Sequence, residues 1–442
     1  MQTHSSNVVS TPADLRIDGA RLWDCLMQLA RIGATDKRGV CRPALTELDR
    51  EARDQFIAWT KEIGRTVSVD AIGNIFARKT GLCDDLPPIM TGSHLDTQPT
   101  GGKFDGNYGV LAGLEVLRPL AEANVQTIAP LEVAMWTNEE GSRFLPVMMG
   151  SGVFAGAFTL EHALAQRDRD GVAVRHALAA IGYAGEHRKS HAVGAYFEVH
   201  IEQRSVLEAH DKVIGVVQGA LGQRWYDLTV HRMEAHAGPM ALRGDALLVA
   251  ADPIHAVNRI ALDHAPHGRS TVGWLEVHSN SRNVIAGRVK FSVDLRAADD
   301  ASLTAMDLAW RAACAQAGSN GGNAAINAAA TRASSSLDAP ITIDIEQVVY
   351  FPPQRFAAQW IAEVRQSAER LGVSSMDVIS GAGHDAAYLA RGAPSAMIFV
   401  PCKDGISHNE IEDARADHLE AGCNMLLQVM PSAASRTGSM RA

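Results

Sequence analysis

The sequence lacks the features of a nucleic-acid-binding, membrane or secreted protein. Among 442 residues, 41 Lys and Arg stand against 50 Asp and Glu, the formal net charge is -9, and the basic residues form no block. Nucleic-acid binding needs a concentrated basic surface, so we expect no such partner. No apolar run approaches the roughly 18–20 residues of a membrane span, and the N-terminus lacks the basic start and apolar stretch of a signal peptide.

Cysteine and aromatic residues are also scarce. The six cysteines lie far apart and form no CxxC pair, which predicts reduced thiols in a cytoplasmic protein without a cysteine-type zinc site. Aromatic residues make up 5% of the chain, whereas 46% hydrophobic and 21% charged residues are typical of a globular protein. The length predicts two to three domains.

Strand-like and helix-like patterns alternate in the first half of the chain. We expect strands at 66–70, 74–79, 88–93, 131–137 and 195–200, and helices at 18–32, 43–63 and 107–117. This alternation predicts an α/β domain with a mixed, partly parallel sheet, in which ligands gather beyond the carboxyl ends of the strands. A helix at 356–371, a strand at 395–400 and a helix at 418–429 resume the same character.

The pattern between these two parts is different. Strands at 224–232, 271–277, 287–295 and 341–349, with helices at 245–264 and 302–316, give the order β-α-β-β-α-β of a ferredoxin-like unit. We therefore predict a domain at 221–349 inserted into a discontinuous domain of residues 1–220 and 350–442. Residues 318–339, which are rich in Ala, Ser, Gly and Asn, are expected to form a loop.

Titratable side chains follow several of the apolar strands. His94 and Asp96 can combine as a metal ligand and the group that orients it, and Asp105 follows a Gly-Gly turn that can return it to the same place. Glu139 and Glu140 are adjacent carboxylates after a buried strand, so one can bind metal while the other accepts a proton from water. Each motif taken alone is equally consistent with a hydrogen-bonded polar core residue or a solvated strand end.

Two further histidines follow strands, His200 in HIEQ and His408 in SHNE. Each alone is more often structural than metal-binding. Together with His94, Asp105 and Glu140, they make a set of nitrogen and oxygen donors that suits Zn²⁺ or a similar transition ion.

The ordered strings GSHLDTQPTGGKFDGNYGV, WTNEEGSRF, HIEQ, EAHAGP, SRNVIAGRV with DLR, GAGHDA and ISHNE resemble the hydantoinase/carbamoylase family of amidases, which are dinuclear metallohydrolases. The resemblance runs from about Asp18 to the final helix. It implies two divalent ions per subunit, Zn²⁺ in the first place, with Mn²⁺, Co²⁺ or Ni²⁺ as alternatives. The Ala/Ser-rich segment and the acidic residues after His408 depart from the family pattern.

The resemblance also implies the role of each motif residue. One metal would take His94 and His200, the other Glu140 and His408, and Asp105 would bridge them, with Glu139 as the general base. The remaining positions lie around these: Asp96 behind the ligands, Gln203, Asn283 and Arg296 on the substrate carboxylate, and His236 and His384 on the carbamoyl oxygen. From the residues alone, Arg296 could instead pair with a nearby surface aspartate, and His384 could be a helix-entry residue.

The activity that the resemblance implies is hydrolysis of an N-carbamoyl-L-amino acid, a small carboxylate carrying a ureido group, by a homodimer. In this interpretation the inserted domain is the dimerisation or lid domain and brings His236 and Asn283 to the partner's active site. Allantoate amidohydrolase, β-ureidopropionase and N-acyl-amino-acid or dipeptide hydrolase activities are alternatives, as is a catalytically silent metal-containing binding protein.

Overall fold

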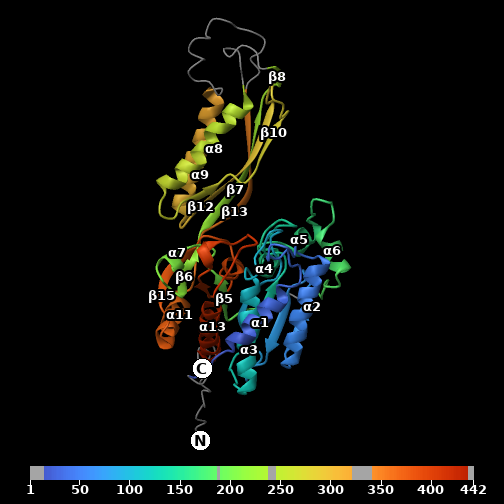
Figure 1. Ribbon diagram of the computed structural model, residues 1–442, viewed down its shortest axis with the longest axis vertical. Helices are drawn as coiled ribbons and strands as arrows, with labels where there is room; N and C mark the ends of the chain where they lie inside the picture. The colour runs from blue at the N-terminus through green and yellow to red at the C-terminus, as the bar shows by residue number, and fades with distance from the viewer. Residues whose placement is uncertain (1–13, 187–189, 237–244, 321–340, 437–442) are drawn as a thin grey trace. The chain divides into compact units, whose positions relative to one another are not determined.

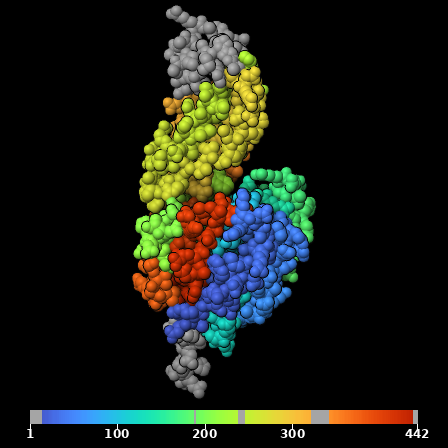
Figure 2. Space-filling view, in the orientation of Figure 1, coloured from blue at the N-terminus to red at the C-terminus, as the bar shows by residue number. Residues whose placement is uncertain are grey.

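The computed structural model describes residues 14–186, 190–236, 245–320 and 341–436 (Figure 1). The chain divides into two units, the first made of residues 1–219 and 355–442 and the second of residues 220–354. The first unit is thus formed by both ends of the chain. Residues near the N-terminus and residues near the C-terminus lie side by side on its surface (Figure 2), where α1 (Gly19–Leu29) packs against α13 (Ala416–Arg436).

The first unit is built on a mixed sheet with the strand order β1-β2-β4-β3-β5-β16-β6-β14, and β15 also pairs with β6. The strands are β1 (Thr66–Val69), β2 (Ile75–Lys79), β3 (Ile89–His94), β4 (Leu131–Trp136), β5 (Ala195–Ile201), β6 (Ile214–Ala220), β14 (Gln354–Arg355), β15 (Ser375–Ser380) and β16 (Ser395–Val400). The four central strands, β4, β3, β5 and β16, are parallel and buried along their whole length, as parallel strands covered on both faces usually are. The mixed α/β fold predicted from the sequence is confirmed.

Helices surround this sheet. Besides α1 and α13 they are α2 (Glu47–Glu62), α3 (Asn107–Glu122), α4 (Met149–Phe154), α5 (Leu160–Ala165), α6 (Val174–Ala180), α7 (Val206–Ala209), α11 (Ala358–Leu371) and α12 (Asp385–Leu389), with a 3₁₀ turn at Lys403–Gly405. α3 lies directly on the strands because its glycines leave room: a Cβ at Gly109 would come within 2.7 Å of the Ser93 side chain. This close packing fixes the start of α3, just after Asp105, against the ends of β3 and β5.

Several element boundaries differ from the sequence-based expectations. The helix expected from residue 43 begins at Glu47, because the Thr46 side chain accepts a hydrogen bond from the Asp49 amide and caps it. α3 continues to Glu122 with Pro119 inside it, and α13 is longer than residues 418–429 at both ends. The sequence analysis did not predict β6 and β15. None of the described helices is both long and apolar enough to cross a membrane.

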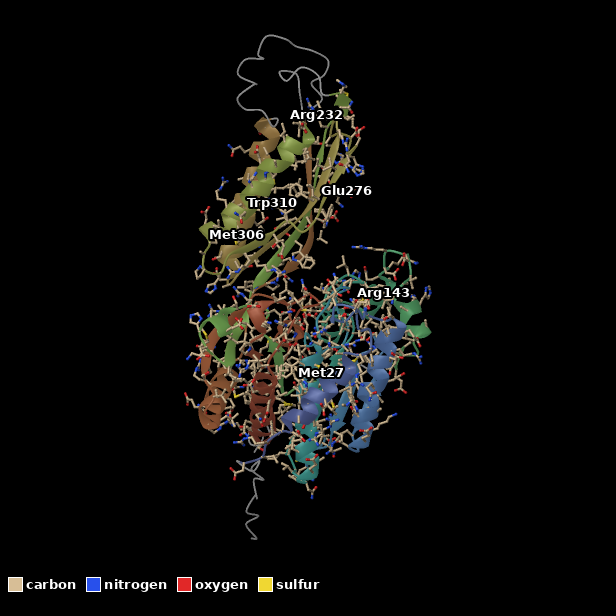
Figure 3. All side chains as sticks on the ribbon, in the orientation of Figure 1. Met27, Arg143, Arg232, Glu276, Met306 and Trp310 are labelled. Carbon is tan, nitrogen blue, oxygen red and sulfur yellow. The ribbon has the colours of Figure 1, made fainter. Side chains whose placement is uncertain are left out.

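The second unit contains β7 (Gly222–His231), α8 (Ala246–Asp263), β9 (Arg269–Thr271), β10 (Leu275–His278), β12 (Arg288–Ala297), α9 (Asp300–Asn320) and β13 (Thr342–Phe351). Its antiparallel sheet has the order β10-β12-β7-β13, with β9 also on β12, and both helices pack on it. The buried Met306 and Trp310 point from α9 into this core (Figure 3). A separate ribbon pairs β8 (Ala235–His236) with β11 (Val284–Ile285).

This order of elements follows the split β-α-β arrangement that the sequence predicted, except that the strand expected at 271–277 is divided into β9 and β10, which both pair with β12. The expected loop at 318–339 needs a correction at its start, because α9 extends to Asn320. Residues 321–339 of that segment lie outside the described residues. A dimerisation or lid role for the second unit stays a prediction.

A buried ion pair ties α2 to the sheet. The Asp49 and Arg53 side chains are almost completely buried, and Arg53 Nε lies 2.9 Å from Asp49 Oδ2. Arg53 also donates to the Gly73 carbonyl oxygen at 2.7 Å and to Thr137 Oγ1 at 3.3 Å. The pair therefore connects α2 with the β1–β2 turn and with the segment that follows β4.

We expect Arg53→Met to lower the free energy of unfolding by about 3–5 kcal/mol, because it leaves the Asp49 carboxylate buried without its partner. Arg50→Met on the same helix is the matched control. The ion pairs of Arg50 are solvent-exposed, so its replacement should lower the free energy of unfolding far less than that of Arg53. Urea denaturation measures both variants, and equal losses would contradict this role for the Arg53 pair.

Candidate metal centre

The predicted metal ligands meet at one edge of the first unit's sheet. His94 is the last residue of β3, Glu139 and Glu140 follow β4, His200 lies at the end of β5, and His408 follows β16. Because these strands are neighbours and parallel, their carboxyl ends lie together. Asp105, in the turn before α3, completes the group.

Two histidines face one oxygen of Asp105. His200 Nε2 lies 3.2 Å and His94 Nε2 3.6 Å from Asp105 Oδ1. The other ring nitrogen of each histidine contacts a backbone carbonyl oxygen at 2.9 Å, that of Asp96 for His94 and that of Ile201 for His200. Since a carbonyl oxygen only accepts, each Nδ1 carries a hydrogen, and in the neutral ring each Nε2 is an acceptor. The Nε2 of His200 also accepts from the Gly106 amide at 3.2 Å.

The other oxygen of Asp105 faces a second pair of groups. His408 Nε2 lies 3.3 Å from Asp105 Oδ2 and 3.4 Å from Glu140 Oε2. The ligand atoms of each trio, His94–Asp105–His200 and Asp105–Glu140–His408, lie within 4.8 Å of one another. Asp105 belongs to both trios through different oxygens, which is the placement that a carboxylate bridging two cations requires.

The electrostatics of the pocket also suit cations. Burial would raise the pKa of Asp105, but the three histidines, when their rings carry a second proton, donate to this carboxylate and hold its pKa well below the usual range. Burial raises the pKa of Glu139 well above its usual value and the pKa of Glu140 to about 7. Acceptor nitrogens and carboxylate oxygens that face one another inside the protein need protons or cations between them. The residues present therefore fit a pair of divalent ions.

Glu139 and Asp96 lie beside the two trios. Glu139 Oε2 is 3.4 Å from His94 Nε2, so this carboxylate borders the first trio without completing the second. The Asp96 carboxylate accepts hydrogen bonds from the backbone amides of Glu139 and Glu140, both at 3.2 Å. Its nearest oxygen is 3.9 Å from His94 Nδ1, so the contact that orients this ring comes from the Asp96 backbone. The expectation that the Asp96 carboxylate holds the ring is corrected in this respect.

Two predicted substrate residues lie in the same unit as the ligands. Gln203 Nε2 donates to Asp105 Oδ2 at 2.8 Å, and Gln203 Oε1 has no hydrogen-bond partner among the described residues. The His384 ring is 4.6 Å from the His200 ring and its Nε2 is also without a partner there. Burial lowers the pKa of His384 well below its usual value, so the ring is neutral and can donate one hydrogen bond to an oxygen.

The other three predicted substrate residues belong to the second unit. The β8–β11 ribbon sets His236 opposite Val284, the neighbour of Asn283, and both His236 and Asn283 are exposed. Arg296 lies near the far end of β12, with its Nε 2.8 Å from Asp294 Oδ2. Among the aspartates that the surface alternative could involve, Asp294 on the same strand pairs with Arg296.

Sequence reasoning missed a buried glutamate behind the centre. The Glu412 carboxylate accepts from the Phe104 amide at 2.9 Å, the Asp105 amide at 3.2 Å and Ser407 Oγ at 2.8 Å. It thus holds the Asp105 turn and the residue before His408. The available signal was the acidic stretch after His408, which was noted only as a departure from the family pattern.

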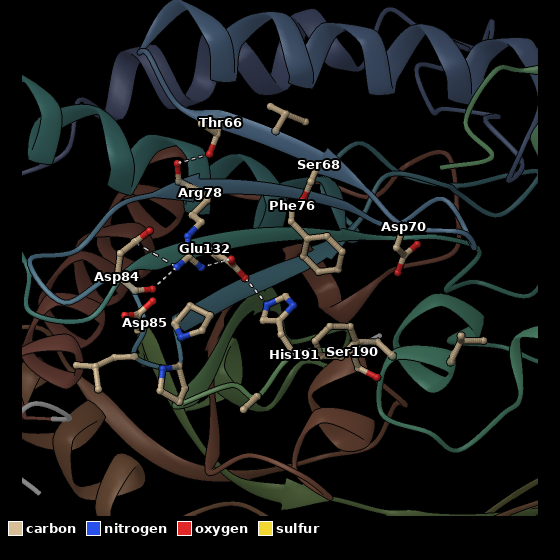
Figure 4. Close-up of a pocket in the computed structure, with 17 residues that line it drawn as sticks. Thr66, Ser68, Asp70, Phe76, Arg78, Asp84, Asp85, Glu132, Ser190 and His191 are labelled. Atoms are coloured by element: carbon tan, nitrogen blue, oxygen red, sulfur yellow. Dashed lines mark hydrogen bonds and ion pairs between the residues drawn. The ribbon is translucent and has the colours of Figure 1, made fainter. Parts of the chain in front are cut away.

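A cavity of about 800 Å³ lies elsewhere in this unit, over β1, β2 and β4. Figure 4 shows Arg78 between Glu132 and Asp84, with His191 reaching Glu132 Oε2 at 2.7 Å. None of the predicted metal ligands lines this cavity, and Arg78, Glu132 and His191 already pair with one another. The cavity is therefore separate from the metal centre.

Comparisons with known proteins agree with this chemistry. Residues 90–432 match the family described as peptidase family M20/M25/M40. An N-carbamoyl-L-amino-acid amidohydrolase of Rhizobium meliloti is 42% identical, over 94% of this chain and 96% of its own. An allantoate amidohydrolase of Bacillus subtilis is 31% identical, over 92% and 96%. A hydantoinase/carbamoylase family amidase from Burkholderia vietnamiensis, known from a crystal structure, is 52% identical in sequence. The two structures superpose with a TM-score of 0.86, over 96% of this chain and 99% of that one.

The two adjacent glutamates should separate in metal content. Glu140→Gln is expected to lose one of two bound ions because it removes a ligand carboxylate, whereas Glu139→Gln should keep both. Glu132→Gln, a buried glutamate on the strand that precedes them, is the matched control and should also keep both. Metal analysis by mass spectrometry after gel filtration measures this, and equal loss from the Glu139 and Glu140 variants would refute their separate roles.

Proposed function

The chain belongs to the peptidase family M20/M25/M40 and, within it, to the hydantoinase/carbamoylase amidases, and from this we propose that it hydrolyses N-carbamoyl-L-amino acids to the amino acid, ammonia and carbon dioxide. The observation that carries the proposal is that Asp105 belongs to both trios of candidate ligands, with Glu139 beside the first of them. That placement fits a hydrolase that activates water with two ions.

His94 and His200 would hold one divalent ion, Glu140 and His408 the other, and Asp105 both. When bound, the ions supply Lewis acidity that polarises the ureido carbonyl and makes a water molecule more acidic. Nitrogen and carboxylate donors suit Zn²⁺ first, with Mn²⁺, Co²⁺ and Ni²⁺ as alternatives.

The side chains perform the proton transfers. Glu139 accepts a proton from the attacking water and delivers it to the leaving nitrogen, and its buried position keeps it ready to hold that proton. The neutral His384 and the His236 imidazole donate hydrogen bonds to the oxygen on which negative charge develops. Gln203, Asn283 and Arg296 bind the substrate carboxylate, for which a guanidinium offers a two-pronged partner. Gln203 does so by turning its Nε2 donor from Asp105 to the substrate.

The geometry of the second unit supports a homodimer with shared active sites. β7 ends at His231, which pairs with Arg288 at the start of β12, and His236 follows shortly after that end of β7. Arg296 lies at the opposite end of β12. The eight residue-to-residue steps from Arg288 to Arg296 span roughly 26 Å of strand. One small substrate cannot contact both side chains of one chain, so we infer that His236 and Asn283 serve the partner's site while Arg296 serves its own.

The six cysteines, all unpaired, suit a cytoplasmic enzyme, which is the location we propose. Allantoate amidohydrolase and β-ureidopropionase activities are the nearest alternatives. Hydrolysis of acyl-amino acids or dipeptides is a less favoured alternative, as is a metal-containing binding protein without catalytic activity.

A substrate panel on the metal-reconstituted protein tests the proposal. Chelation should abolish hydrolysis of N-carbamoyl-L-amino acids, and Zn²⁺, Mn²⁺ or Co²⁺ should restore it. Glu139→Gln should lose roughly 10²–10⁴-fold in kcat. N-Carbamoyl-β-alanine, allantoate and N-acetyl amino acids complete the panel. Preferred turnover of one of these would replace the proposed substrate, and full turnover by metal-free protein would refute the metal-dependent mechanism.

Arg296→Lys should raise KM for carboxylate substrates about tenfold and leave the metal content unchanged, because lysine keeps the charge but loses the fork. Arg288→Lys, at the other end of the same strand, is the control and should leave KM as it is. An unchanged KM in the Arg296 variant would mean that its role is confined to the pair with Asp294.

Mixed dimers test the shared site. His236→Ala and Glu139→Gln homodimers should each be nearly inactive, whereas mixing them after reversible dissociation should restore part of the activity, since one site of each heterodimer contains both residues. Wild-type protein taken through the same dissociation is the control. If mixing restores nothing, or if a monomer is fully active, His236 acts within its own chain.

A further inference from the structure

Arg42 is a completely buried arginine that the roles described above do not include. Its Nη1 donates to the carbonyl oxygens of Leu29 at 3.1 Å and Ile32 at 2.8 Å, which anchors the guanidinium at the end of α1. The rest of the guanidinium faces the metal centre. Burial lowers the pKa of Arg42 to about 10, so the group still carries its charge at neutral pH.

The remaining donors of Arg42 reach two of the segments that bear predicted metal ligands. Nε donates to the carbonyl oxygen of Leu95 at 2.8 Å, the residue directly after His94. Nη2 donates to Asn107 Oδ1 at 2.6 Å, two residues after Asp105. One rigid, planar group thus joins the His94 loop to the Asp105 turn.

The backbone of Arg42 strengthens this connection. Its amide donates to Thr97 Oγ1 at 2.8 Å, and its carbonyl oxygen accepts from the Thr97 amide at 3.0 Å. Next to it, Val40 exchanges backbone hydrogen bonds with Gly101, in the loop that leads to Asp105. The segment of residues 40–42 therefore lies along the whole stretch from His94 to Asp105.

We propose that Arg42 is a positioning residue of the metal centre, which sets the separation of His94 from Asp105 by holding Leu95 and Asn107 in one plane. The inference rests on the proposed function, because it assumes that these two residues bind metal. The five N–H groups of a guanidinium point in fixed directions, whereas a lysine ammonium has three donors and no such plane. Groups that orient metal ligands typically change metal affinity 10–100-fold when they are replaced.

The test compares Arg42→Lys with Arg118→Lys in the full chain. Arg118 is also a buried arginine, but it donates to Glu115 and Cys25, away from the metal centre, so its variant reports only the general cost of replacing a buried guanidinium. Co²⁺ is the probe, because its visible absorption depends on ligand geometry. Metal affinity, absorption spectrum and melting temperature are measured for each protein.

We expect Arg42→Lys to weaken Co²⁺ binding 10–100-fold and to change the visible spectrum, while Arg118→Lys changes only the melting temperature. An Arg42 variant with wild-type affinity and spectrum would overturn the inference, whatever its melting temperature. Failure of the wild type itself to bind Co²⁺ would instead refute the proposed function.

Asn107→Ala keeps the test open if Arg42→Lys does not fold. It removes the hydrogen bond between the guanidinium and Asn107, together with the 3.3 Å bond from Asn107 Nδ2 to the Lys103 carbonyl oxygen, and leaves the other bonds of Arg42 in place. We expect a shift of the Co²⁺ spectrum in this variant. Where Arg42→Lys does fold, the double variant should lose less affinity than the product of the two single losses, because both changes break the same contact. An unchanged spectrum in Asn107→Ala would overturn the inference.

Discussion

The structure depends on one constraint, the convergence of hydrogen-bond acceptors on the buried Asp105. Two histidine nitrogens approach one of its oxygens, and a histidine and a glutamate gather at the other. Without protons or cations between them, these nitrogen and oxygen acceptors repel one another, and burial makes the repulsion stronger. The protein must therefore hold them in place through contacts made behind them, so that a cation finds its ligands already arranged.

The fold supplies these contacts as backbone and buried polar interactions. Parallel strands deliver the ligands to one edge, and the glycines of α3 let the Asp105 turn sit directly on them. Behind the ligands, the Asp96 carboxylate holds the two glutamate amides and Glu412 holds the amide of Asp105. Each of these acceptors binds a backbone N–H, so the rigidity of the chain itself is passed on to the metal ligands.

The second unit carries three of the predicted substrate-binding residues. It carries no predicted metal ligand, and its long antiparallel strands set Arg296 apart from His236 and Asn283. In the proposed homodimer, one site would take these side chains from two chains. A substrate would then be enclosed only when both chains contribute, which would link binding to the exclusion of water.

The sequence by itself determined the α/β class and the identity of the ligand candidates, because His94, Glu140, His200 and His408 each stand where an apolar strand ends. It did not assign a role to Arg42 or Glu412, since neither stands at a strand end, and Leu95 and Phe104, which they hold, lie 53 and 308 residues away in the chain. It also assigned the His94 ring to the Asp96 carboxylate, whereas the backbone oxygen of Asp96 holds it. Only tertiary packing decides such contacts, because the partner of a buried donor is whichever acceptor the folded chain places beside it.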